Sequence, residues 1–159
     1  MIFVTVGSQK FPFERLVKAV DELVEKGAIR DEVFIQIGVC PYEPRFCRWE
    51  RFLDRDDFEK YISECDLLIT HAGEGAIMSG LLRDKKVIAV PRYAKLGEHV
   101  SDHQFEIARS LEKAGNIVNV EAIEELEGAI KNIRKVELSK YIPGKGKIVQ
   151  IICEYIDMN

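Results

Sequence analysis

The stretch DLLITHAGEGAIMSG, residues 66–80, decides the fold. Its first part, DLLIT (66–70), is apolar almost throughout, which is typical of a short strand covered on both faces. Gly73 and Gly75 follow two positions apart, and a helix is predicted from about Gly75 to Arg83. A buried strand that passes into a helix through a glycine-containing turn is a building block of α/β proteins.

The rest of the chain repeats this alternation of strand and helix. Strand candidates lie at 2–6, 32–38, 87–91 and 116–120, with a short one at 51–53, and residues 39–50 read as a loop with two prolines. Helix candidates lie at 12–28, 54–65, 101–115 and 122–133, the second capped by Asp54 and the third ending at Gly115. The pattern predicts one α/β domain over 1–159, with a mostly parallel Rossmann-like sheet and helices on both faces.

Composition narrows the function classes. The chain has 159 residues, of which 47% are hydrophobic and 31% charged, and this balance supports a core under a solvated surface. The 23 basic and 27 acidic residues give a net charge of −4, with no basic face that would favour nucleic acid. No apolar run reaches the roughly 18 residues of a membrane span, and MIFVTVGSQK at the start does not resemble a signal peptide.

The four cysteines, Cys40, Cys47, Cys65 and Cys153, include no CxxC pair and no histidine at metal-ligand spacing. Cys65 and Cys153 fall in apolar patterns and are expected in the core. We therefore expect a reducing, cytoplasmic setting, no metal and no cofactor.

Segments that follow strands of a parallel sheet are where ligands bind. In HAGEGA (71–76), the two glycines and the free N–H groups of the next helix suit a diphosphate, but the local pattern alone favours a plain strand-to-helix turn without a ligand. The P-loop motif of ATPases is absent, and GSQKFPF after the first strand is not the dinucleotide fingerprint.

The second such segment is SDHQ (101–104). Ser101 and Gln104 match a capping box, which alone accounts for both. The functional alternative has Asp102, His103 and Gln104 project toward a polar ligand such as a sugar. His71, a lone histidine at a strand end, has a structural and a functional interpretation in the same way.

Several stretches in order resemble a known family. DLLITHAGEGAIMSGLLRDKKVIAVPR and HVSDHQFEIARSLEKAG resemble the C-terminal, donor-binding half of family 28 glycosyltransferases. MIFVTVGSQKFPFERLVKAVDEL, with YEP at 42–44, resembles short single-domain relatives that form one chain of a two-chain enzyme. These are the soluble subunit of the dolichol-pathway N-acetylglucosaminyltransferase and bacterial capsule or exopolysaccharide subunits.

The resemblance implies half of a GT-B glycosyltransferase, whose two Rossmann-like domains face each other across a cleft. Gly7 would lie at the cleft floor, main-chain groups near Phe52 would meet the base, and Gly73–Ala76 would approach the diphosphate of a UDP-sugar. Asp102, His103 and Gln104 would lie near the donor sugar. His71, Glu74, Gly75 and Ala76 complete the candidate donor site.

Two positions depart from the family pattern, which often has a hydroxyl at Ala76 and a carboxylate at Ser79. Loss of that carboxylate, which would hold the ribose, is expected to weaken nucleotide binding about tenfold. Three functions stay open: a donor-binding subunit, a regulatory subunit with a weakened donor site, and an unrelated mononucleotide or flavin binder.

The resemblance places the general base and the lipid-linked acceptor in a membrane-anchored partner chain. We therefore expect the chain to be inactive alone and to lie at the membrane only through that partner. An apolar stripe near the end, Ile148, Ile151, Ile152, Tyr155 and Ile156, is a candidate docking element, and packing on the chain's own sheet explains it as well.

Overall fold

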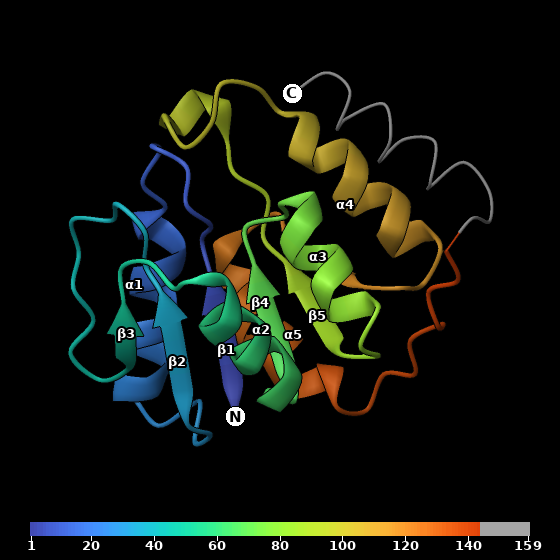
Figure 1. The fold of residues 1–159 in the computed structure, drawn as a ribbon, viewed down its shortest axis with the longest axis horizontal. Coiled ribbons are helices and arrows are strands. Elements are labelled where there is room, and N and C mark those ends of the chain that lie inside the picture. The colour runs from blue at the N-terminus through green and yellow to red at the C-terminus, as the bar shows by residue number, and fades with distance from the viewer. Residues whose placement is uncertain (144–159) are drawn as a thin grey trace.

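The computed structural model describes residues 1–143 and builds them around one parallel sheet (Figure 1). Its six strands lie in the order β3-β2-β1-β4-β5-β6. Their bounds are β1 Ile2–Thr5, β2 Val33–Gln36, β3 Arg48–Glu50, β4 Leu67–Thr70, β5 Lys86–Ala89 and β6 Val118–Asn119. This order has the chain leave β1 toward β2 and β3, then return to β4 on its other side, so the expected Rossmann-like α/β fold is confirmed.

Helices cover both faces of the sheet (Figure 1). They are α1 Glu14–Glu25, α2 Arg55–Glu64, α3 Glu74–Leu81, α4 His103–Lys113 and α5 Leu126–Ile133, with 3₁₀ turns η1 Ala94–Leu96 and η2 Ile123–Glu125. α1 and α5 pack on one face, while α2, α3 and α4 pack on the other. β4 is buried along its whole length, as DLLIT predicted. Ile69 packs on the face covered by α1 and α5, and Leu68 packs on the face covered by α2, α3 and α4.

The predicted strand at 51–53 is wrong in position. β3 lies three residues earlier, where Arg48, Trp49 and Glu50 pair in parallel with β2. It is the edge strand of the sheet, and two of its three residues are charged and exposed. An edge strand with solvated side chains gives no apolar signal, so the sequence pattern misplaces it into the loop.

Two predicted helix ends are confirmed. The Asp54 carboxylate accepts a hydrogen bond from the Asp57 N–H at 2.8 Å and caps α2. After α4, Gly115 adopts a φ of +78°, and Asn116 N–H donates to the Leu111 carbonyl at 2.9 Å. Only a residue tolerant of positive φ suits this helix stop.

Asp21 of α1 anchors the loop between β2 and β3. Its carboxylate accepts hydrogen bonds from the Tyr42 hydroxyl at 2.6 Å and from the N–H groups of Arg45 and Phe46 at 3.0 and 2.9 Å. Burial alone would raise the pKa of Asp21, but the bond from Tyr42 and the two backbone bonds lower it below the usual value. The YEP stretch of the sequence therefore has a structural role, because Tyr42 ties the loop to α1.

Within residues 1–143, no helix has both the length and the apolar content that crossing a bilayer requires. The apolar stripe from Ile148 to Ile156 and Cys153 lie outside the described residues.

We predict that Asp21→Ala lowers the free energy of unfolding by on the order of 2–4 kcal/mol at pH 7, because three donors lose a charged acceptor that is itself buried. Because its folded pKa is lowered, the contribution of Asp21 is complete above a pH of about 4 and is lost as the pH falls through the folded pKa. Urea denaturation at pH 7 and at pH 3 measures both effects.

Tyr42→Phe is the matched control, since it removes one of the three bonds and should cost about 1–2 kcal/mol. Equal costs for the two variants, or a full cost of Asp21→Ala at pH 3, would contradict this role of Asp21.

Candidate functional site

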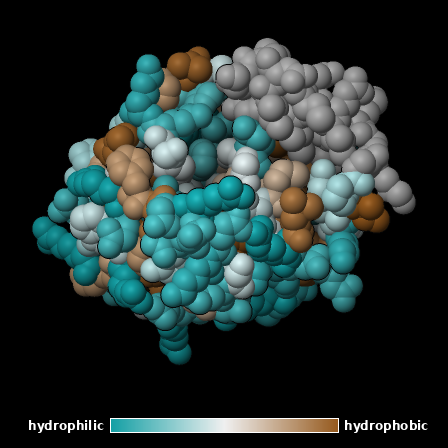
Figure 2. Space-filling view, viewed as in Figure 1, coloured by the Kyte–Doolittle hydropathy of each residue, from teal (hydrophilic) through white to brown (hydrophobic). Residues whose placement is uncertain are grey.

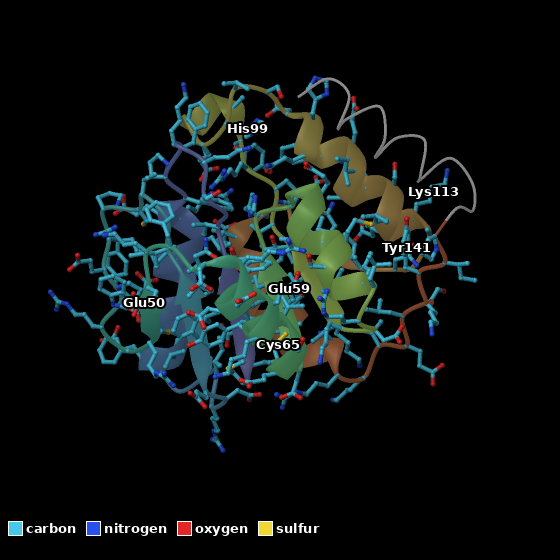
Figure 3. The ribbon with its side chains drawn as sticks, viewed as in Figure 1. Glu50, Glu59, Cys65, His99, Lys113 and Tyr141 are labelled. Atoms are coloured by element: carbon cyan, nitrogen blue, oxygen red, sulfur yellow. The ribbon has the colours of Figure 1, made fainter. Side chains whose placement is uncertain are left out.

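A cavity of about 450 Å³ opens at the carboxyl edge of the sheet, where β1 and β4 diverge into their loops. This is the point at which parallel α/β sheets bind ligands. In Figure 3, His99 marks the carboxyl edge of the sheet, and Cys65, which follows α2, marks the opposite end. Figure 2 shows that the upper part of this face is hollowed. The cavity is lined by Thr5, Gly7, Ser8, Gln9, Gln36, Leu53, Asp54, Arg55, Phe58, His71, Gly73, Glu74, Gly75, Ala76, Ser79 and Gln104.

The His71 ring is wedged between two glycines at the cavity floor. A Cβ built on Gly7 would lie 2.8 Å from Cε1 of the ring, and one built on Gly73 would lie 2.3 Å from Nε2. Gly7 also has a φ of +75°. Both glycines are therefore required by the ring that they enclose, in addition to any ligand.

His71 is a neutral group in this structure. Burial and, after it, the nearby positive charge of Arg92 lower its pKa from 6.5 to about 3. Nδ1 lies 3.3 Å from the Thr5 carbonyl, which can only accept, so the ring hydrogen belongs on Nδ1. Nε2 then keeps its lone pair, but a ring with a pKa of about 3 is a poor general base at neutral pH.

The N-terminus of α3 faces the cavity without a side-chain cap. Its N-cap is Gly73, which makes no side-chain hydrogen bond, and Gly75 leaves open space around its Cα. Uncapped N–H groups and the helix dipole favour an anion, by roughly 0.3–1 kcal/mol for the dipole alone. Glu74, also lining the cavity, is the opposing charge in this first turn.

The predicted site residues do not all converge. Gly7, His71, Gly73, Glu74, Gly75, Ala76 and Gln104 line the cavity. Phe52 does not, and its side chain is 51% exposed, although the adjacent Leu53 does line it.

Asp102 and His103 also stay outside the cavity. Asp102 accepts a hydrogen bond from the Ala94 N–H at 3.1 Å, and His103 lies beside Glu106 on α4. The predicted capping box is wrong, because α4 begins at His103 and the Gln104 amide oxygen instead accepts from the Arg92 N–H at 3.2 Å.

Arg92 is a feature of the site that the sequence reasoning missed. Its side chain is fully buried beneath the cavity, where Nη2 donates to the Val6 carbonyl at 2.5 Å and the guanidinium lies over the Phe13 ring. Nη1 also reaches the Gln9 side chain at 3.4 Å. Arginine is almost never fully buried, so no sequence signal separates this residue from a surface one.

We predict that Gly73→Ala destabilises the protein by about 1–3 kcal/mol, because the new methyl group overlaps the His71 ring. Gly75→Ala, two positions along and in open space, should be neutral or stabilise α3 by up to about 1 kcal/mol. Thermal unfolding of the two variants measures the contrast. Equal melting temperatures would show that the ring is not wedged as described.

Known proteins are similar to this chain in sequence and in fold. Residues 1–150 match the model of the glycosyltransferase family 28 C-terminal domain. The mouse UDP-N-acetylglucosamine transferase subunit ALG13 is 30% identical over 131 residues, which cover 72% of this chain and 10% of the mouse protein. The chain thus spans about a tenth of the length of its mammalian relatives.

Solved structures agree at the level of the fold. MurG from Acinetobacter baumannii superposes with a TM-score of 0.63 at 17% identity, over 99% of this chain and 49% of that chain. An NMR structure of ALG13 has a TM-score of 0.61 at 17% identity, over 95% and 93% of the two chains. The family match covers nearly the whole sequence, and the chain belongs to the family of glycosyltransferase family 28 C-terminal domains.

Proposed function

We propose that this protein is the donor-binding subunit of a two-chain glycosyltransferase. It binds a UDP-sugar, and a membrane-anchored partner holds a lipid-linked acceptor and supplies the general base. The observation that carries the proposal is the cavity at the carboxyl edge, where the uncapped N-terminus of α3 meets His71 and Gln104.

The geometry supports a nucleoside diphosphate as the ligand. Backbone N–H groups at the start of α3 suit the diphosphate, and Gly73 and Gly75 carry no side chain that would keep it away. Nε2 of the neutral His71 ring can accept a hydrogen bond at the cavity floor. The cavity volume of about 450 Å³ falls in the range of small-molecule sites.

The division of labour between two chains rests on the comparisons and on chemistry. This chain matches about half of the MurG chain, and its mouse relative is named as a subunit of a UDP-N-acetylglucosamine transferase. UDP-N-acetylglucosamine is therefore the first donor to test. A His71 pKa of about 3 leaves that ring unsuited to activate an acceptor hydroxyl, which favours a base in the partner.

One observation favours a second function, that of a regulatory subunit with a weakened donor site. Ala76 and Ser79 both line the cavity, so a hydroxyl and a carboxylate that many family members have are missing from its wall. Glu74 in the same wall adds a negative charge near the expected diphosphate.

A titration of the ¹⁵N-labelled protein with UDP tests the donor-binding role. We expect amide shifts concentrated at Gly73, Gly75 and Gln104, with weak affinity because half a cleft covers only part of the ligand. Ser79→Glu should tighten UDP binding about tenfold, since a carboxylate in this wall can accept from the ribose hydroxyls.

Ser79→Ala is the matched control and should leave the affinity within about twofold, because it removes only a neutral hydroxyl. Amide shifts scattered over the surface, or no shifts at the highest UDP concentration, would favour the regulatory role. A Ser79→Glu variant that binds no better than wild type would contradict the assigned position of the ribose.

A further inference from the structure

Three neighbouring strands end on a buried polar side chain at the same level of the sheet. β1 reads IFVT, β2 reads VFIQ and β4 reads LLIT, and Thr5 is in register with both Gln36 and Thr70. Thr5 and Thr70 are fully buried, and Gln36 is 5% exposed. Because side chains alternate along a strand, all three lie on the face covered by α2, α3 and α4.

The Gln36 amide oxygen faces Thr5. The Thr5 hydroxyl donates to Gln36 Oε1 at 3.5 Å and accepts from the Gly7 N–H at 3.1 Å. The amide nitrogen of Gln36, with two hydrogens, has no hydrogen-bond partner among residues 1–143 and belongs to a side chain that lines the cavity.

Thr70, the third member of the row, is engaged elsewhere. Its hydroxyl lies 3.3 Å from Nδ1 of His71. Gln36 is thus the member of the row that offers donors to a ligand. The Gln36 side chain is 5% exposed, and an amide in the cavity wall with unused donors points to a ligand acceptor.

The two ends of the cavity differ in their helix N-termini and in apolar surface. On the side of α3 and α4, the uncapped N-terminus after Gly73 suits phosphate. On the side of α2, the Asp54 side chain already caps the helix start, and the opposite charges of Asp54 and Arg55 both line the cavity, so this end offers an anion no uncapped helix N-terminus. Leu53 and Phe58 supply apolar surface on that same side.

We propose that Gln36 determines specificity at the nucleoside end of the donor, by donating an amide hydrogen bond to an oxygen of the base or ribose. The inference rests on the proposed function, because it assumes a nucleoside diphosphate with its phosphates at α3. Gln36 lies at the end of β2, on the side of the cavity where the capped start of α2 and the apolar side chains of Leu53 and Phe58 form the wall.

Titrations of the full chain with two probes, UDP and inorganic diphosphate, test this role. Gln36→Met keeps the approximate length and the zero charge of the side chain but removes the donors. We expect it to weaken UDP binding about tenfold or more while diphosphate affinity stays within about twofold. Gln36→Glu, which removes the donors and adds a negative charge, should weaken UDP at least as much and is read for UDP alone.

A loss of UDP affinity without a loss of diphosphate affinity distinguishes recognition of the nucleoside by Gln36 from a purely structural role of this residue. A parallel loss of UDP and diphosphate would mean that Gln36 only holds the cavity in shape, and it would overturn the inference. Unchanged UDP affinity in both variants would overturn it as well, while leaving the proposed function intact. A wild-type chain that binds diphosphate no more weakly than UDP also overturns it, and one that binds neither probe overturns the proposed function itself.

Discussion

The imidazole of His71 is the group on which the whole carboxyl edge depends. It stands at the end of the central strand β4, and the Gly7 loop after β1 and the Gly73 turn before α3 both close around it. Neither turn has room for a Cβ against the ring. The residue between ring and turn, Ala72, has a φ of +64°, a conformation that costs a residue with a side chain roughly 1–2 kcal/mol. The packing of the ring offsets this cost and fixes the direction in which α3 leaves the sheet.

The position of α3 in turn determines what the cavity can bind. Because the turn is made of small residues, the first N–H groups of the helix are open to a ligand rather than capped by the protein. Arg92 contacts two residues of the cavity wall. Its backbone N–H donates to the Gln104 side chain, and its guanidinium donates to the Gln9 side chain. One end of the cavity has an uncapped helix N-terminus, and the other has a capped one with apolar side chains beside it. This asymmetry is the physical basis for an oriented nucleotide.

The central elements could be predicted from sequence because burial leaves a clear pattern there. DLLIT and the turn after it gave the strand, the helix and their position at the sheet edge, and Asp54 and Gly115 marked helix ends correctly. The sequence was ambiguous where one residue type serves two roles. Ser101 and Gln104 have the spacing of a cap, yet Gln104 bonds to the backbone of Arg92, a contact that only the fold brings together.

Other features were beyond sequence reasoning for physical reasons. The edge strand β3 has solvated charges and no apolar period, and its existence depends on pairing with β2. A buried arginine looks like a surface arginine in a sequence. The polar last residues of IFVT, VFIQ and LLIT were visible, but their meaning required the register that aligns Thr5 with Gln36 and Thr70.

The state of the His71 ring is the most direct measure of this arrangement. Long-range ¹H–¹⁵N correlation spectra of the labelled protein report the charge and the tautomer of each histidine. The structure predicts that His71 stays neutral from pH 7 down to pH 5 with its hydrogen on Nδ1, because burial lowers its pKa to about 3 and the Thr5 carbonyl accepts that hydrogen. Titration of His71 near its ordinary pKa of 6.5, or a hydrogen on Nε2, would contradict the wedged ring and the site built around it.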